Sequence, residues 1–465
     1  MNLPRISRLL LLGVVLAATA GCNVDERLWW SPDGSRAALR TPAGLCLVDA
    51  TGGSVSAPVA SDVTAAAWLP DGKMLAIVRK IEVSKWSDVV RLATPGEIKQ
   101  AELLAKGMPD LSKALRTITN NDAKAIDDKF PVLLKVARDE FVTPALLCLR
   151  DTLPDLLRAS IEGFKDADKL RQELTELKAE VFELSVLTLA GNQITGEPLV
   201  LERTLTQLEK PRPSPSVPVI AFLRGDTLVA APIAGGSNCL TVSEKVEGSF
   251  DWTPDGKSLA FATRLAENWD SGSVNLARIQ RRSAVDANGS LLAGDIASLS
   301  TIATVHPPRV RCMPDGRVLV ASVVSNFPAA ADAEQETRLY VIDSAKEPAI
   351  PVALPTGPKA LPMELAHFAP SPDGKKIALV ESGSDVVAVL DVATGAVEVV
   401  SPKRDLKCRT LPAWRGAEEL YFAALPEPGA KRVEWMRWKS GSAPVVFSRG
   451  WADATVDGLL EEAKK

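Results

Sequence analysis

Histidine is nearly absent from this chain, which has two histidines among 465 residues and a formal net charge of only −4. So few histidines exclude a histidine-rich metal centre and argue against histidine-dependent catalysis. The charge balance lacks the basic excess of a nucleic-acid-binding protein. Low-complexity disorder is excluded as well, since 46% of the residues are hydrophobic. These absences remove several functional classes without naming one.

A short hydrophobic run near the N-terminus has the length of the apolar part of a secretory signal. It covers residues 9–18 and follows two arginines, and it is shorter than the roughly 20 residues that span a bilayer. It ends in Thr19-Ala20-Gly21-Cys22, which resembles the lipobox of bacterial lipoproteins. The resemblance implies that residues 1–21 are a removable signal peptide and that Cys22 carries a lipid. An ordinary secretory signal with an incidental cysteine is the alternative.

The segment after this cysteine is a short tether. Residues 22–27 separate the lipid site from the first expected strand, Leu28-Trp29-Trp30. Extended chain of this length reaches roughly 20–25 Å, so the folded part is expected close to a membrane surface of the cell envelope. Asn23 after the cysteine favours the outer membrane over the inner one in the family that the lipobox resembles. Whether the protein faces the periplasm or the exterior is left open.

A Pro-Asp-Gly turn recurs along the chain, each time after an aromatic or apolar residue and before an apolar run. Proline presets the first corner, aspartate bonds to local backbone and glycine accepts a positive φ, so the pattern predicts a tight hairpin. Five copies make a much stronger signal than one. The turn residues, to which we assign a structural role, are Pro32, Asp33, Gly34, Pro70, Asp71, Gly72, Pro254, Asp255, Gly256, Pro314, Asp315, Gly316, Pro372, Asp373 and Gly374.

These copies resemble the TolB-type, WD40-like β-propeller repeat. The resemblance implies an all-β fold, with a propeller over residues 28–450 and a C-terminal tail over residues 451–465. Blades of about 40 residues fit the repeat spacing, except for the long step between Gly72 and Gly256. A further blade with a degenerate turn at residues 212–215 fits into that step. The prediction is therefore seven blades, with six as the alternative.

The rest of the long step is expected to be helical. Between residues 96 and 180 the apolar pattern changes from a period of two to one of 3.6. The clearest amphipathic helix is predicted over residues 170–184, before a strand at residues 186–189. The insert is therefore expected between the second and third strands of blade two. That connection lies opposite the Pro-Asp-Gly turns, on the face where propellers of this kind usually bind ligands. A decorative insert is the alternative.

No catalytic or cofactor motif accompanies the repeats. The sequence has no Gly-x-Ser-x-Gly elbow, no Gly-x-Gly-x-x-Gly and no phosphate-binding Gly-Lys-Ser/Thr loop. His306 and His367 are interpreted as packing or turn residues, and we predict no catalytic residue, metal or cofactor. An odd number of cysteines besides Cys22 favours buried thiols over a disulfide pair. They are Cys46, Cys148, Cys239, Cys312 and Cys408.

The sequence thus predicts a membrane-tethered, non-enzymatic propeller that binds a protein or peptide at the face bearing the insert, and no nucleic acid. The alternative is a carboxylate- or metal-dependent propeller enzyme, lactonase- or lyase-like, acting on a small molecule or a sugar. Three or more Asp, Glu or Asn side chains around the axis would favour that enzyme. The partner itself stays unidentified at this stage.

Overall fold

The computed structural model describes most of the chain. The described residues are 26–53, 55–117, 141–162, 167–235, 239–265, 275–304, 308–323, 337–354, 365–381, 386–400, 410–424, 433–448 and 450–451. Cys22, His306 and Cys408 lie outside these ranges.

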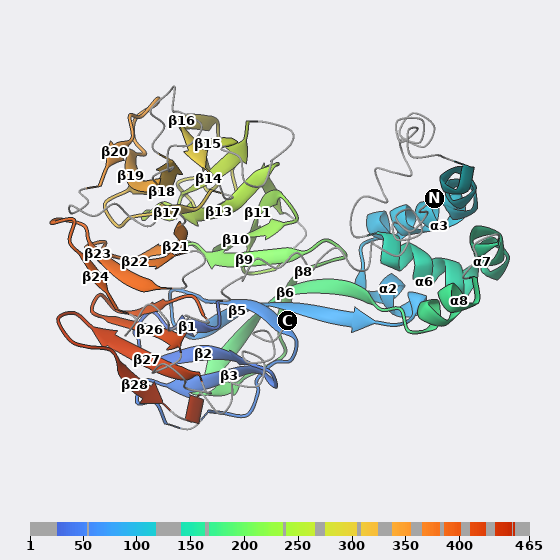
Figure 1. Ribbon diagram of the computed structural model, residues 1–465, viewed down its shortest axis with the longest axis horizontal. Coiled ribbons are helices and arrows are strands. Elements are labelled where there is room, and N and C mark those ends of the chain that lie inside the picture. The colour runs from blue at the N-terminus through green and yellow to red at the C-terminus, as the bar shows by residue number, and fades with distance from the viewer. Residues whose placement is uncertain are drawn as a thin grey trace, which may run out of the picture. The chain divides into compact units, whose positions relative to one another are not determined.

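Seven antiparallel sheets follow one another along the chain and form the blades of a propeller (Figure 1). Blades 1 and 2 contain β1 (Leu28–Trp30), β2 (Arg36–Thr41), β3 (Gly44–Asp49), β4 (Val63–Trp68), β5 (Met74–Val83), β6 (Ala179–Ala190), β7 (Gln193–Ile194) and β8 (Leu199–Thr204). Blades 3 and 4 contain β9 (Leu208–Pro213), β10 (Val219–Arg224), β11 (Thr227–Pro232), β12 (Leu240–Ser243), β13 (Val246–Trp252), β14 (Ser258–Arg264), β15 (Asn275–Ser283) and β16 (Ile296–Thr304). This confirms the seven-bladed prediction over the six-bladed alternative.

The last three blades repeat the same up-and-down order. They contain β17 (Val310–Cys312), β18 (Arg317–Val323), β19 (Thr337–Asp343), β20 (Val352–Ala353), β21 (Leu365–Pro370), β22 (Lys376–Glu381), β23 (Val387–Asp391), β24 (Val397–Val399), β25 (Ala413–Arg415), β26 (Glu419–Ala424), β27 (Glu434–Lys439) and β28 (Val445–Ser448). The first strand of a blade contacts the first strand of its neighbour, as β1 does with β4 and β25, and β13 with β17. The first strands therefore surround the propeller axis.

Tryptophans before the turns join neighbouring blades. An indole N–H donates to a first-strand carbonyl of the preceding blade at 2.8, 2.8 and 2.9 Å for the pairs Trp68 to Trp29, Trp252 to Arg212, and Trp414 to Ala369. A large apolar ring with one donor suits this place, because the ring packs between sheets while the N–H finds an acceptor. Each bond fixes the same point of the preceding first strand.

The turn aspartates accept hydrogen bonds within their own turns. Asp33 Oδ1 accepts the Ser31 hydroxyl at 2.6 Å and the Ser35 backbone N–H at 3.0 Å. Asp71, Asp255, Asp315 and Asp373 likewise accept the backbone N–H two residues later, at 2.8 to 3.1 Å. The glycine of each of the five turns has a φ between 63° and 86°, a region that side chains with a Cβ rarely enter.

Protonation of the turn carboxylates is expected to weaken the fold in acid. Hydrogen bonds from the Ser31 hydroxyl and from Ser35 lower the pKa of Asp33 to about 2. The folded-state pKa lies below the unfolded value of about 3.9, so this stabilisation is present above about pH 4 and is lost as the pH falls towards 2. Thermal unfolding measured between pH 5 and pH 2.5 should show a shallower acid limb for Asp33→Asn than for the wild type. Asp155→Asn, at a side chain that is 92% exposed, is the control; equal slopes for all three proteins would contradict the prediction.

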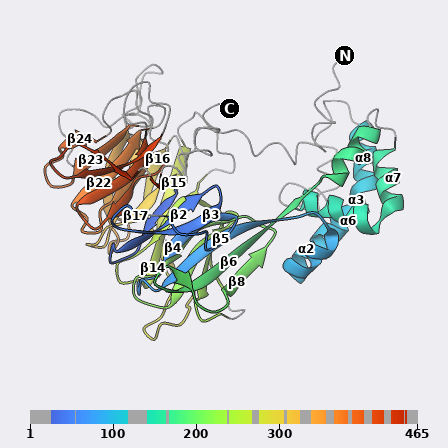
Figure 2. The ribbon, with the colours of Figure 1, turned by 90° about the horizontal axis from the view of Figure 1, so that it is seen from below.

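The insert forms a second compact unit with its own core. Its described helices are α2 (Trp86–Leu92), α3 (Pro95–Thr117), α6 (Val142–Thr152), α7 (Pro154–Ile161) and α8 (Ala167–Thr175). They lie in sequence between β5 and β6, the second and third strands of blade 2, as predicted (Figure 2). Trp86, Leu104 and Leu147 are buried in this core. None of the helices among the described residues is long and apolar enough to cross a membrane.

Two boundaries of the insert differ from the sequence-based expectation. The first helix begins at Trp86, ten residues before the expected start at 96. The helix predicted over residues 170–184 ends at Thr175, and β6 begins at Ala179. Residues 181–187 of β6 are buried on both faces of the sheet. A strand buried on both faces places apolar residues at any spacing, so its start satisfied the helical period by chance.

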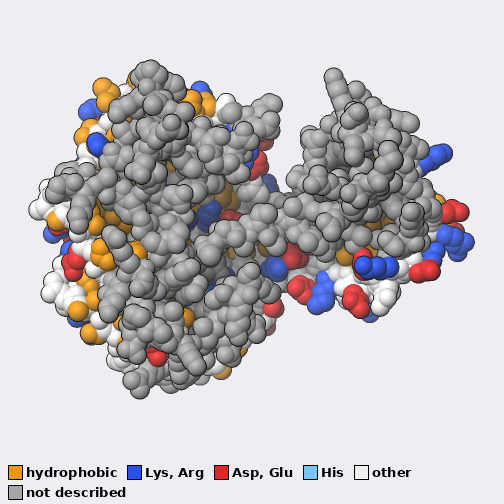
Figure 3. Space-filling view, viewed as in Figure 1, with side chains coloured by type: hydrophobic (Ala, Val, Ile, Leu, Met, Phe, Trp, Pro, Cys, Tyr) orange, Lys and Arg blue, Asp and Glu red, His pale blue; other side chains and the backbone are white. Residues whose placement is uncertain are grey.

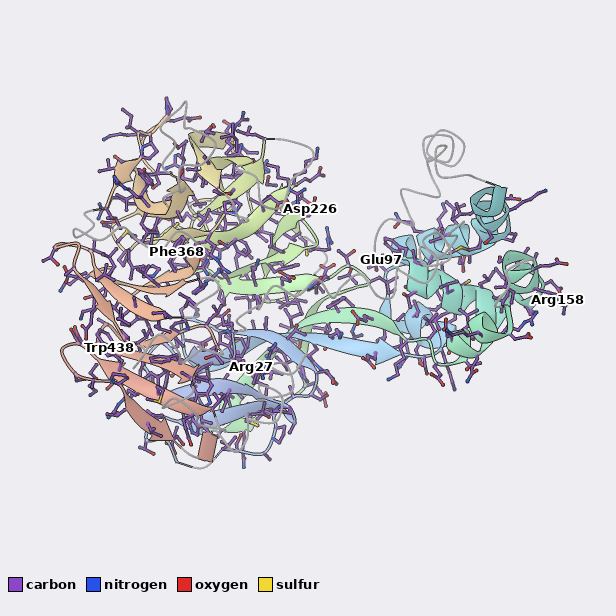
Figure 4. The ribbon with its side chains drawn as sticks, viewed as in Figure 1. Arg27, Glu97, Arg158, Asp226, Phe368 and Trp438 are labelled. Atoms are coloured by element: carbon purple, nitrogen blue, oxygen red, sulfur yellow. The ribbon has the colours of Figure 1, made fainter. Side chains whose placement is uncertain are left out.

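Charged side chains link the two strands that lead into the helices. Lys80 pairs with Glu180 at 2.6 Å, and Lys178 pairs with Glu82 at 2.8 Å. Glu97 connects the helices to the chain after β8. It closes a capping box with Thr94 at the start of α3 and accepts the Leu205 N–H at 2.9 Å (Figure 4). The strand pair therefore continues up to the point where the helices begin.

The propeller closes without exchanging a strand between its first and last blades. Blade 1 uses only N-terminal strands and blade 7 only C-terminal strands. The two blades meet in a cluster that includes Leu28, Tyr421, Trp435 and Trp451. Trp451, the first residue of the expected tail, is fully buried there. Side-chain packing therefore closes the ring, and residues 452–465 lie outside the described part of the chain.

Candidate functional site

The residues singled out from the sequence do not form one site. The turn aspartates are spread over five blades and bond within their own turns. Among the described residues, no group of three or more His, Cys, Asp or Glu side chains could hold a metal ion. Cys46 and Cys148 are buried thiols without a disulfide. The residues predicted from the sequence therefore have structural roles and do not form a binding site.

A surface pocket lies between the turns of blades 1 and 2. Its volume is about 660 Å³, and Asp33, Arg36 and Asp71 contribute to its lining. The Arg36 guanidinium already donates to the carbonyls of Gly72, at 2.6 Å, and of Gly191. It also lies 4.9 Å from the centre of the Trp68 ring. The charged groups of this pocket are therefore engaged in holding the two blades together.

Basic side chains gather instead where the first strands surround the axis. Lys210 and Arg212 lie on β9, while Arg309 directly precedes β17 and Arg311 lies on it. Alternate residues of a strand share a face, and the residues between these pairs, Pro211 and Val310, are buried. We call Lys210, Arg212, Asp251, Arg309, Arg311 and His367 the axial cluster. Lys and Arg side chains are visible between the blades near the middle of the propeller unit (Figure 3).

The cluster occupies equivalent positions of successive repeats. Counting back from the first residue of each turn, two positions recur on the first strands of blades 1 to 6. The residues two before the turn are Trp29, Ala67, Arg212, Asp251, Arg311 and Ala369. The residues four before it are Arg27, Ala65, Lys210, Ser249, Arg309 and His367. Blades 3 to 5 thus supply the charged groups, blade 6 supplies the neutral His367 and blade 2 supplies alanines, while the buried Arg27 stands just before β1 (Figure 4).

His367 is held neutral by its surroundings. Its side chain is 5% exposed, and an Nη of Arg309 lies 2.8 Å from its Nδ1. A guanidinium has only donors, so Nδ1 is the acceptor and the ring proton is on Nε2. Burial lowers the pKa of His367 well below its usual value, and the charges of Arg309, Arg311 and Arg212 lower it further. The ring is therefore an uncharged acceptor for Arg309 at neutral pH.

Asp251 is the carboxylate of the cluster, and backbone groups take up much of its bonding capacity. Oδ2 accepts the Cys312 N–H at 3.0 Å, and Oδ1 accepts the Trp252 N–H at 3.1 Å. The nearest approach of Arg212 to it is 4.0 Å, from Nη1 to Oδ1. This is beyond hydrogen-bond distance. The buried Nε of Arg212 has no hydrogen-bond partner.

The cluster is positively charged in surroundings that disfavour charge. Burial lowers the pKa of Arg311 to about 9, with a contribution from Arg212. Burial also lowers the pKa values of Arg309 and Lys210. Glu26 acts in the opposite direction on both Arg309 and Arg311. At neutral pH Arg311 remains protonated. The axial cluster, Glu26 and Glu209, which pairs with Lys210 at 3.5 Å, together contribute four cations and three carboxylates.

Sequence reasoning did not find this cluster, although a signal for it exists. Lys210-Pro211-Arg212 and Arg309-Val310-Arg311 each place two basic residues with a period of two just before a turn. The same two positions of blade 2 hold Ala65 and Ala67, so charge there distinguishes these blades. Aligning the repeats by the residues before the turn, as well as by the turn itself, would have shown it.

No protein-family model matches the chain, and no curated protein matches it. Solved structures similar to the chain include the hydrazine synthase of Kuenenia stuttgartiensis, at 12% identity and a TM-score of 0.45, covering 90% of this chain and 98% of that chain. The β-propeller domain of the trilobed protease from Pyrococcus furiosus is similar at 14% identity and a TM-score of 0.38, covering 59% of this chain and 77% of that chain. A TolB-like protein from Agrobacterium tumefaciens is similar at 14% identity and a TM-score of 0.36, covering 54% of this chain and 84% of that chain.

Proposed function

We propose that this protein is a lipid-anchored propeller of the cell envelope that binds a protein or peptide without catalysing a reaction. One observation carries the proposal, namely the axial cluster. It brings cationic donors together around His367 and Asp251. Among the described residues there, no three carboxylates form a group and no nucleophile is activated. Donors without a reacting group beside them suit binding.

The histidine of the cluster is poorly placed to act as a general base. A base must offer a free lone pair to the proton that it removes. The Nδ1 lone pair of His367 accepts from Arg309 at 2.8 Å, and Nε2 carries the proton. The surrounding arginines also oppose protonation of the ring. His367 therefore supports a binding role by orienting Arg309.

Anchoring is proposed from the lipobox-like sequence that ends at Cys22. Glu26, four residues later, acts electrostatically on Arg309 and Arg311. A chain of this length reaches about 14 Å when extended. The lipid would therefore hold the axial cluster near a membrane surface, where the partner would be another component of the envelope.

The insert gives the proposal a second testable part. The Lys80–Glu180 and Lys178–Glu82 pairs place Val83 opposite Leu177. Replacing residues 84–176 by Asn-Gly would close β5 and β6 with a two-residue hairpin. Because the helices have their own core, the propeller is expected to stay folded and to lose the partner that docks at the insert.

The experiment compares four chains in the native envelope, namely wild type, Cys22→Ser, the insert deletion and, as control, Asp226→Asn at an exposed turn of the propeller. Cys22→Ser should lose metabolic labelling with palmitate and move from the membrane to the soluble fraction. Chemical cross-linking followed by purification should recover a partner with the wild type and the control, and at least about fivefold less of it with the insert deletion. Membrane retention of Cys22→Ser, or full recovery by the insert deletion, would contradict the anchoring and docking parts respectively.

A further inference from the structure

We infer that the axial cluster binds an oxyanion, meaning a carboxylate or phosphate group of a ligand that enters the propeller axis. The inference rests on the proposed function, because it names the chemistry of the group that the binding propeller receives. It depends on the geometry of the cluster and not on the lipid anchor.

The first support is the charge balance. Arg212, Arg309 and Arg311 face two carboxylates, Asp251 and the exposed Glu26 just before β1, while Lys210 pairs with Glu209 at 3.5 Å. His367 adds no negative charge. Partly buried cations in excess of their counter-charges are costly. An oxyanion with one negative charge would restore the balance.

The second support is that the Arg212 guanidinium lacks an acceptor for part of its hydrogen-bonding capacity. Arg212 approaches Asp251 only to 4.0 Å, and its buried Nε has no partner. Both oxygens of Asp251 already accept backbone N–H groups. The carboxylate therefore cannot turn fully towards the guanidinium, and an additional acceptor is required to satisfy it.

The third support is the kind of donor. Guanidinium groups present parallel N–H bonds that match the two oxygens of a carboxylate or phosphate. Arg309 is fixed in place by its bond to His367, so little side-chain entropy is lost when a ligand binds. Lys210 donates to the carbonyl of Gly248 and contributes mainly charge. This combination selects an oxyanion over an uncharged ligand.

Thermal unfolding of the purified full chain tests the inference. Inorganic phosphate, citrate and a hexaglutamate peptide are added in turn, each against chloride at equal ionic strength. At about 100-fold the dissociation constant, the midpoint should rise by roughly 3–5 °C. The double variant Arg212→Gln/Arg311→Gln should lose this rise. Arg158→Gln/Arg171→Gln should keep it, since both of its side chains are exposed on α7 and α8.

A second variant tests the site without removing a donor. Asp251→Asn deletes the carboxylate that competes with the ligand, so its affinity for the best of the three probes should increase roughly fivefold to tenfold by calorimetry. Weaker binding by Asp251→Asn would overturn the inference, and so would equal midpoint rises for both arginine double variants. No binding of any probe to the wild type would overturn it too.

The three probes distinguish the source of the group. A rise with phosphate or citrate alone indicates a free small oxyanion, and a larger rise with hexaglutamate indicates an acidic segment of a partner; both outcomes support the site. These measurements use purified protein, whereas the proposed function is tested by fractionation and cross-linking in envelopes. Failure of one is therefore distinguishable from failure of the other.

Discussion

Replacing Trp451 with alanine is expected to lower the free energy of unfolding by about 3–5 kcal/mol, the usual cost of emptying a buried tryptophan site. Trp451 is fully buried. Its ring centre lies 5.1 Å from that of Phe447 and 6.2 Å from that of Trp435, both in edge-on contact. Urea unfolding followed by tryptophan fluorescence and circular dichroism measures the change.

The effect should be large because side chains alone close the ring. Blade 1 and blade 7 share no sheet, and the hydrogen bonds that join them include Arg415 Nε to the Gly34 carbonyl at 2.8 Å and Ser448 Oγ to the Gly52 carbonyl at 2.9 Å. Losing the aromatic cluster would expose the apolar faces of blades 1 and 7 that it joins. Exposed apolar patches promote aggregation, so Trp451→Ala should also aggregate earlier on heating.

Two variants make this prediction specific. Trp451→Phe keeps an aromatic ring in the cluster and should cost well under half as much. Val399→Ala, at a side chain that is 59% exposed on the last strand of blade 6, should change the unfolding midpoint little. An unfolding midpoint for Trp451→Ala equal to that of the wild type would show that the ring is closed by something other than this cluster.

The repeat architecture was predictable because its signal is local. Each Pro-Asp-Gly turn follows from the conformational preferences of three adjacent residues, and five copies gave the period. Even the degenerate turn of blade 3 has a local explanation. Ser214 Oγ donates to the Gly256 carbonyl at 2.9 Å, and Ser216 Oγ donates to the Asp255 carbonyl at 2.6 Å. These serines attach the altered turn to the regular turn of the next blade.

The axial cluster was not predictable in the same way. Lys210 and Arg309 are far apart in the sequence, and only the closed ring brings their strands to a common axis. Its residues share positions in the repeat, but they belong to no motif that carries chemistry. The contact between Arg309 and His367 also depends on which first strands are neighbours. Sequence reasoning therefore gave the scaffold and interpreted His367 as a packing residue, while its neutral, arginine-bound state required the structure.

Replacing Asp251 with asparagine is expected to lower the free energy of unfolding by about 2–3 kcal/mol in the absence of an oxyanion. Breaking a buried ion pair costs about 3–5 kcal/mol, and the estimate is reduced because the Asp251 side chain is 20% exposed. Asparagine keeps the shape but only one of the two acceptor oxygens, so the loss combines the missing charge with one backbone hydrogen bond. It leaves Arg212, Arg309 and Arg311 with Glu26, while Lys210 stays paired with Glu209. Asp226→Asn, at an exposed turn residue between β10 and β11 (Figure 4), should cost less than about 0.5 kcal/mol.

A double-mutant cycle separates charge balance from local packing. If the cost of Asp251→Asn comes from unbalanced positive charge, then Arg311→Gln added to it should recover more than half of the lost stability, because a cation is removed together with the carboxylate. Phosphate should recover part of the loss as well, since it supplies the missing charge at the same place. Additive costs of the two substitutions, with no effect of phosphate, would mean that Asp251 acts only through its backbone hydrogen bonds to Trp252 and Cys312. The axial cluster would then be a structural feature of the ring, with no free capacity for a ligand.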